Sequence, residues 1–198
     1  MLNEELQKRW GEMLKNIDSE VQIRALTEIE LAALQKQTCS EVRLGGPGCD
    51  RDASRTGLSY VLRNTLVEKL KAANPTVRAL ALLAFTRWEE YFALEHIEKA
   101  LKDDDASVRM AAIHAATITN ATDLLPRIVQ MAENDVDLFV RAKAVDAIKW
   151  FIQHIYRSSG KAIQTRDDIT HLKRVLAEVK AKDPAPYVRF VAEALDKP

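Results

Sequence analysis

The sequence predicts an all-α fold, a right-handed α-solenoid of about five helix pairs that forms one domain over residues 1–198. Three observations support this prediction. Apolar residues recur with a helical period, no stretch alternates apolar and polar residues for long enough to form a strand, and one short pattern repeats along the chain. Paired helices that repeat in this way stack so that each pair buries its apolar face against its neighbours.

The repeated pattern is a Val-Arg dipeptide at the start of an apolar helix. It begins at Val77, Val108, Val140 and Val188, and a weaker copy is Ile23-Arg24. Apolar residues follow each dipeptide at helical spacing and predict one buried stripe per helix. The predicted stripes are Val77, Leu80, Ala81, Ala84; Val108, Ala111, Ala112, Ala115; Val140, Ala144, Ala147, Ile148; and Val188, Val191, Ala192, Leu195.

A second amphipathic segment precedes each Val-Arg helix and completes a pair. These first helices are predicted at residues 58–73, 91–102, 123–133 and 168–180. Pro75 and Pro184 mark the start of second helices, and Asp105 with Ser107 is expected to cap another. The predicted units are residues 2–38, 58–90, 91–120, 121–157 and 168–197, with insertions at 41–57 and 158–167.

The segment DLLPRIVQMAENDVDLFVRAKAVDAIKWF, residues 123–151, resembles a HEAT repeat: a short first helix, an acidic turn, then Val-Arg and an alanine-rich second helix. The resemblance is to HEAT-like repeats of the bacterial lyase type and extends over about residues 17–197. It implies the α-solenoid fold and, as its commonest role, the binding of a protein or peptide.

Four arginines hold the same position in successive units. The resemblance implies that they pair with acids of the inter-helix turns and form a structural ladder along the stack. The alternative is a phosphate-binding track, which the many turn aspartates disfavour because they offer the arginines charge-assisted hydrogen bonds. The ladder residues are Arg78, Arg109, Arg141 and Arg189, and the candidate acceptors are Asp103, Asp104, Asp105, Asp135, Asp137 and Asp183.

Partner-binding residues are predicted in two groups. Aromatic side chains gather near the ends of two second helices, where they form a contact surface or, alternatively, seal the seams between helix layers. Basic residues lie in the two insertions, which both follow a second helix and are expected to project from one edge and clasp a partner. The residues are Trp88, Tyr91, Trp150, Tyr156, Arg51, Arg55, Lys161 and Arg166.

No catalytic, cofactor-binding or metal-binding residue is predicted. The glycine-rich stretch GGPGCD lacks the lysine and the preceding strand of a phosphate loop. No two of His96, His114, His154 and His171 share a helix face at ligand spacing, and Cys39 and Cys49 complete no ligand set with them. An enzyme is therefore not the favoured reading, and no cofactor is expected.

Charge and composition limit the functional classes to which the protein can belong. Lys and Arg number 29 and so do Asp and Glu, so no overall field favours nucleic acid or an anionic membrane. There is no apolar run long enough for a membrane span, and only two cysteines, which favours the cytoplasm. A protein- or peptide-binding scaffold is the leading function. The alternatives are a nucleic-acid binder resembling HEAT-like alkylpurine DNA glycosylases and an enzyme-assisting protein resembling phycobilin lyase subunits.

Overall fold

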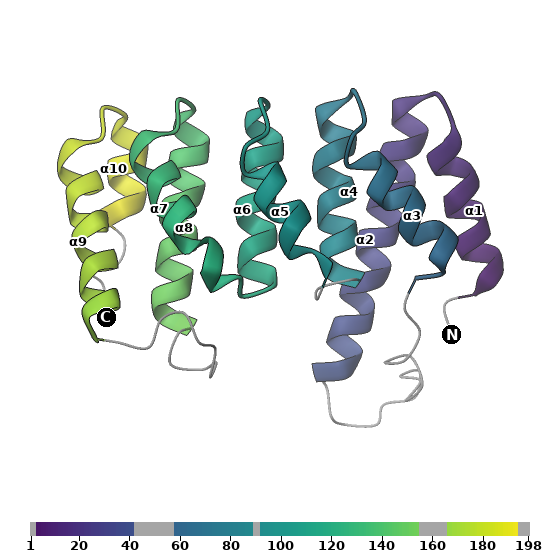
Figure 1. Cartoon of the computed structure of the whole chain (residues 1–198), viewed down its shortest axis with the longest axis horizontal. Coiled ribbons are helices and arrows are strands. Elements are labelled where there is room, and N and C mark those ends of the chain that lie inside the picture. The colour runs from purple at the N-terminus through teal and green to yellow at the C-terminus, as the bar shows by residue number, and fades with distance from the viewer. Residues whose placement is uncertain (1–2, 42–57, 89–91, 155–165, 194–198) are drawn as a thin grey trace. The chain divides into compact units, whose positions relative to one another are not determined.

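A computed structural model describes residues 3–41, 58–88, 92–154 and 166–193, except for the side chains of 35–41, 166 and 167 (Figure 1). The described residues contain helices and turns and no strand, which confirms the all-α prediction. They fall into two compact units, Met1–His96 and Ile97–Pro198. Within these ranges no helix combines the length and hydropathy needed to cross a membrane.

The N-terminal unit is built from two helix pairs and the start of a fifth helix. In this unit α2 packs against α1 and α4, and α3 packs against the same two helices. Trp10, Leu26, Leu66 and Phe85 are at the centre of its core and are at most 2% exposed. The helices are α1 (Glu4–Lys15), α2 (Ser19–Glu41), α3 (Tyr60–Lys69), α4 (Pro75–Trp88) and α5 (Leu94–Ala100).

The C-terminal unit begins within α5 and is organised around α8, which packs against α6, α7, α9 and α10. Ile128, Ile148, Phe151 and Val188 are fully buried at its centre. The elements are α6 (Ala106–Ile118), the 3₁₀ turn η3 (Thr122–Leu124), α7 (Leu125–Asn134), α8 (Leu138–His154), α9 (Arg166–Lys182) and α10 (Pro186–Glu193).

The predicted apolar stripes form the buried faces of the second helices. Almost every described stripe residue of α4, α6, α8 and α10 is less than 9% exposed, whereas Leu80 and Val191 are half-buried. Leu195 lies outside the described residues. Alanines at most stripe positions of α6 and α8 let neighbouring helices approach closely, as stacked pairs require.

Short polar side chains start the second helices. The Oδ1 atom of Asp105 accepts a hydrogen bond from the Ser107 N–H at 2.8 Å, and that of Asn74 accepts one from Thr76 at 2.9 Å. Each bond satisfies an N–H that has no partner inside its helix. Pro75 is the first residue of α4, as expected, whereas α10 begins at Pro186, two residues after Pro184.

Gly11 gives a test of helix packing in the N-terminal unit. It is a buried residue of α1, and a Cβ atom added there would meet no heavy atom within 4 Å. Because glycine destabilises a helix interior relative to alanine, Gly11→Ala should raise the free energy of unfolding by about 0.5–1 kcal/mol. Urea denaturation measures this change. Lys8→Ala, on the exposed side of α1, is the control and should change little; a loss of stability in Gly11→Ala would contradict the open space at this position.

Candidate partner-binding surface

Buried ion pairs join the helix pairs of the C-terminal unit. The Nε and Nη2 atoms of Arg109, on α6, donate to Asp135 at 2.9 and 2.8 Å. In the same way, Arg141 of α8 donates to Asp183 at 2.8 and 3.1 Å. Asp135 lies in the α7–α8 turn and Asp183 in the α9–α10 turn, so each arginine reaches the turn of the following pair. This is the geometry that the structural interpretation of the ladder requires.

Each ladder arginine also binds the turn before its own helix. Its Nη1 atom donates to the carbonyl oxygens of the residues six and five positions earlier, such as Asp103 and Asp104 for Arg109, at 3.0 and 2.9 Å. The same two bonds fix the orientation of the other three guanidinium groups. The acceptors are Ala72 and Ala73 for Arg78, Asp135 and Val136 for Arg141, and Asp183 and Pro184 for Arg189.

The acceptor aspartates stabilise their own turns as well. Asp135 accepts a hydrogen bond from the Asp137 N–H at 3.0 Å, and Asp183 accepts one from the Ala185 N–H at 2.8 Å. The Asp183 side chain is only 4% exposed and that of Arg141 10%. One carboxylate therefore holds a turn in shape and receives the arginine of the preceding pair.

The ion pairs shift the pKa values of the two arginines and of Asp183. The hydrogen bonds that Arg109 and Arg141 donate to Asp135 and Asp183 raise the pKa of both arginines above the usual value, although burial opposes this. Burial by itself would raise the pKa of Asp183, but hydrogen bonds from Arg141 and from the Ala185 N–H, with the charges of Arg141 and Arg189, bring it below its ordinary value. Arg141 and Asp183 therefore both stay charged at neutral pH.

The first helix pair departs from the sequence pattern. Arg24 is exposed and its Nε atom pairs with Glu28 at 3.3 Å, whereas the Gln22 side chain donates to the Asn16 carbonyl oxygen. Gln22 therefore occupies the ladder position, two residues before the arginine that the pattern indicated. The correct signal is the spacing from the helix start, because Gln22 lies four residues after Asp18, as Arg109 lies four residues after Asp105.

Asp183 provides a test of the ladder. Asp183→Asn should lower the free energy of unfolding by about 3 kcal/mol at pH 7, because it leaves the buried charge of Arg141 without its counter-ion. Since its folded-state pKa is lowered, the carboxylate stabilises the fold fully above its unfolded-state pKa of about 3.9, and this stabilisation is lost as the pH falls through the folded-state value. Urea denaturation between pH 7 and pH 3 should therefore show a shallower acid loss in the variant. Asp104→Asn, in an exposed turn position, is the control; equal losses in both variants would contradict the assignment.

Two of the eight predicted partner-binding residues are described with their side chains. The indole N–H of Trp88 donates to the Ile29 carbonyl oxygen at 3.1 Å and connects α4 to α2. The indole of Trp150 stacks on His154 with ring centres 4.2 Å apart. Both tryptophans are half-buried, so they pack within the fold and still present part of their surface. Their role in binding stays a prediction.

The other six lie where contacts are not described. Arg51, Arg55, Tyr91, Tyr156 and Lys161 are outside the described residues, and Arg166 begins α9 with a side chain that is not described. No contacts are described for the predicted insertions at 41–57 and 158–167, of which only the end of α2 and the start of α9 are described. The same holds for the side chains of both cysteines. Among the residues that are described, no three His, Cys, Asp or Glu side chains are grouped to hold a metal ion.

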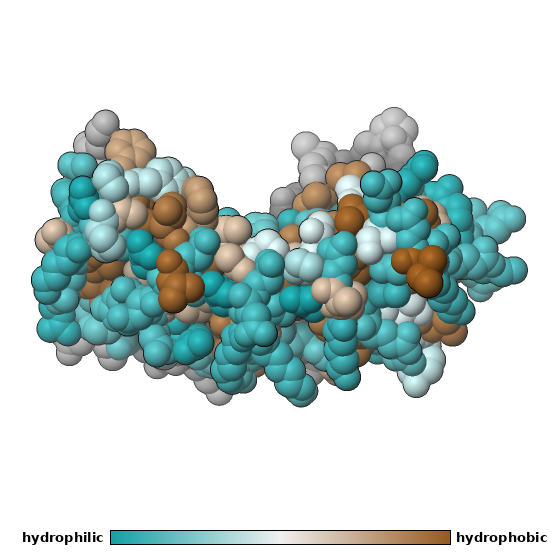
Figure 2. Space-filling model, turned by 90° about the horizontal axis from the view of Figure 1, so that it is seen from above, coloured by the Kyte–Doolittle hydropathy of each residue, from teal (hydrophilic) through white to brown (hydrophobic). Residues whose placement is uncertain are grey.

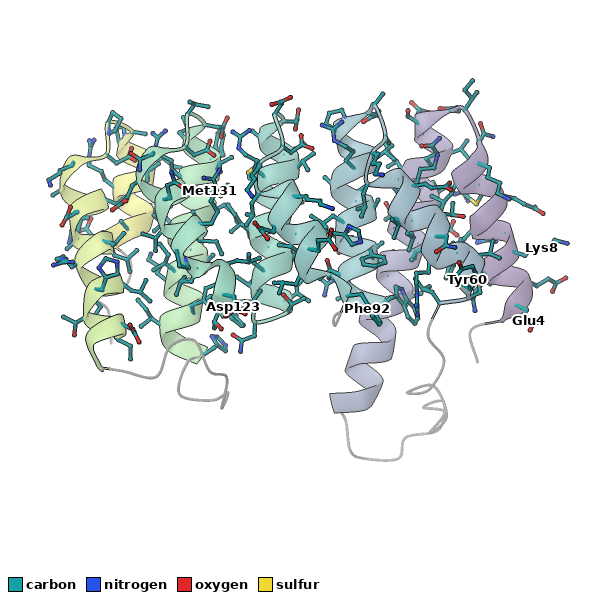
Figure 3. All side chains as sticks on the ribbon, in the orientation of Figure 1. Glu4, Lys8, Tyr60, Phe92, Asp123 and Met131 are labelled. Atoms are coloured by element: carbon teal, nitrogen blue, oxygen red, sulfur yellow. The ribbon has the colours of Figure 1, made fainter. Side chains whose placement is uncertain are left out.

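A groove that the sequence did not reveal lies between the starts of α7 and α9. Its volume is about 480 Å³, and its apolar part comes from Leu125, Pro126, Val129 and Leu172. Polar residues line the rest, namely Thr122, Asp123, Asp168 and His171. Figure 3 shows Asp123 at the lower end of α7. No motif indicates this groove, because its residues come from two helices that are more than thirty residues apart in the chain.

A smaller groove of about 390 Å³ lies between α1 and α3 in the N-terminal unit. Acidic and basic side chains alternate along it: Glu4, Lys8, Glu12 and Lys15. Figure 3 shows Glu4 and Lys8 on α1 and Tyr60 at the start of α3. Because its charges are mixed, this groove favours neither a positively nor a negatively charged ligand. The α7–α9 groove is therefore the stronger candidate for a binding site.

Comparison with known families agrees with the helix pairs. Residues 64–149, which run from α3 into α8, match the family described as HEAT repeats. This segment of the chain consists of HEAT repeats. The HEAT-repeat match includes Arg78, Arg109 and Arg141 and stops before Arg189.

Comparison with solved structures supports the same fold. The crystal structure of an engineered protein from the Northeast Structural Genomics Consortium superposes with a TM-score of 0.59 and 21% identity, covering 96% of this chain and 78% of that one. At this identity the likeness concerns the fold alone. No curated protein matches the sequence.

Proposed function

We propose that this chain is a non-enzymatic cytoplasmic scaffold that binds a protein or peptide. HEAT repeats commonly mediate protein interactions. The observation that carries the proposal is the α7–α9 groove, which offers a recessed apolar surface with acidic residues beside it. Its volume lies within the range of about 300–1,000 Å³ that is usual for ligand sites.

The chemistry of the groove favours one kind of peptide. Val129 and Leu172 offer apolar contacts, whereas Asp123 and Asp168 add negative charge. A segment that combines apolar side chains with lysine or arginine complements both features. The helices that form the two walls, α7 and α9, also pack directly against each other.

The two alternative functions have less support. Arg109 and Arg141 use Nε, Nη1 and Nη2 on aspartates and carbonyl oxygens, so these guanidinium groups are engaged and a phosphate-binding track is disfavoured. No observation on the described residues favours a lyase-subunit role.

The test is a pull-down from native extract, with bound protein and nucleic acid analysed together. Val129→Arg should reduce partner capture by tenfold or more, because the new side chain fills the apolar part of the groove; tenfold corresponds to about 1.4 kcal/mol of binding energy. Gln153→Arg introduces the same side chain at an exposed position of α8 and should leave capture unchanged. Equal capture by both variants would show that the groove is not the binding site, and capture of nucleic acid alone would contradict the proposal.

A further inference from the structure

A further recess of the C-terminal unit, called the turn pocket below, lies between the α5–α6 turn and α7. Its volume is about 360 Å³, and all its residues belong to the continuously described stretch 92–154. Its most buried lining residues are Leu101 and Met131, which are 0% and 4% exposed. Figure 3 shows Met131 towards the upper end of α7, away from Asp123. The pocket is lined by residues 101–104, Arg109, Arg127, Gln130, Met131, Asn134 and residues 135–136.

One lining residue, Arg127 of α7, has a guanidinium group whose hydrogen bonds are incomplete. The side chain is half-buried, and its Nη1 atom donates to the Gln130 Oε1 atom at 2.6 Å. Its Nε atom is buried and has no acceptor among the residues that the structure describes. In Arg109 and Arg141 the same atom donates to an aspartate. Because a buried N–H without an acceptor destabilises a fold, Arg127 is a costly residue at this position.

The register of the repeats shows that packing does not require an arginine here. Asp135 and Asp183 hold equivalent positions in successive turns, and the residue at equal distance before each is Arg127 on α7 and Val175 on α9. Val175 is 4% exposed and belongs to the apolar core. Since α9 fills this position with an apolar side chain, the arginine of α7 indicates a role other than packing.

The other two cations of the turn pocket already have carboxylate partners. Arg109 and Asp135 neutralise each other in the ladder. Lys102 pairs with Glu98, one helical turn earlier, at 3.1 Å. Arg127 is the remaining cation, and no described carboxylate pairs with it.

The acidic side chains of the α5–α6 turn restrict which anion can bind. Asp103 and the exposed Asp104 both line the turn pocket. A phosphate group carries nearly two negative charges at neutral pH, so these carboxylates repel it more than they repel a single carboxylate. The charges of the pocket therefore favour a carboxylate as the ligand of Arg127.

The rim of the turn pocket offers an apolar contact as well. Val136, in the α7–α8 turn, lines the pocket and is 92% exposed. Figure 2, which looks down on the inter-helix turns, shows hydrophobic side chains among hydrophilic ones over the C-terminal unit, at the left. An apolar side chain next to the bound carboxylate can contact Val136 and lose water-exposed surface there.

We propose that the turn pocket binds an acidic side chain of a partner's peptide segment, with the carboxylate on Arg127 and a neighbouring apolar side chain on Val136. The carboxylate supplies the guanidinium with the kind of acceptor that Arg109 and Arg141 find in an aspartate. Helical geometry places Arg127 and Val129 on opposite faces of α7, so this site does not depend on the α7–α9 groove.

The test titrates the full chain with two capped dipeptides, acetyl-Leu-Glu-amide and its uncharged counterpart acetyl-Leu-Gln-amide. The Nε–H signal of Arg127 and the backbone amide signal of Val136 report binding in ¹⁵N–¹H NMR spectra. The glutamyl peptide should bind about tenfold more tightly than the glutaminyl peptide, because only the former makes a charge-assisted hydrogen bond. Arg127→Gln should remove this difference. Lys173→Gln deletes one positive charge at an exposed position of α9 and should preserve it.

A second variant separates binding from a structural role of the arginine. Arg127→Val introduces the side chain that α9 has at the equivalent position and removes the buried donor that lacks an acceptor. It should abolish the preference for the glutamyl peptide, whereas the urea midpoint of unfolding should stay the same or rise. A clearly lower midpoint would show that Arg127 holds the fold together and would overturn the proposal.

The remaining outcomes are equally decisive. Equal binding of the two dipeptides, or no binding of either, would contradict a carboxylate site. Inorganic phosphate that shifts the same signals at lower concentration than the glutamyl peptide would replace the carboxylate by a phosphate and overturn the assigned ligand. Val129→Arg should leave the titration unchanged, so a failure of the turn pocket and a failure of the α7–α9 groove are distinguishable.

Discussion

The bidentate Arg–Asp pair between successive helix pairs is the constraint on which the C-terminal unit depends. A helix pair buries its apolar stripe against its neighbours, but apolar packing is non-directional and tolerates sliding. Arg109 and Arg141 remove that freedom, because each one binds two carbonyl oxygens of its own turn and both oxygens of one aspartate in the next turn. The planar guanidinium accepts this arrangement in one geometry only.

The aspartates of the ladder stabilise both their own turns and the contact between helix pairs. The same aspartate that receives the arginine also accepts an N–H of its own turn, so the shape of the turn and the register between pairs depend on one side chain. A buried ion pair is by itself weak evidence for stability, since the desolvation of two charges offsets their attraction. Its contribution here is to fix which turn lies against which helix.

By itself, the sequence determined the helix pairs, the buried stripes and the position of most ladder residues, because helical periodicity and helix-start chemistry act within a few residues of each other. It did not reveal the ladder position of α2, where Gln22 rather than an arginine binds the preceding turn. Only the tertiary structure decided which aspartates Arg109 and Arg141 bind and where the α7–α9 groove lies. These features depend on residues from separate helices, and their distances are set by packing rather than by spacing along the chain.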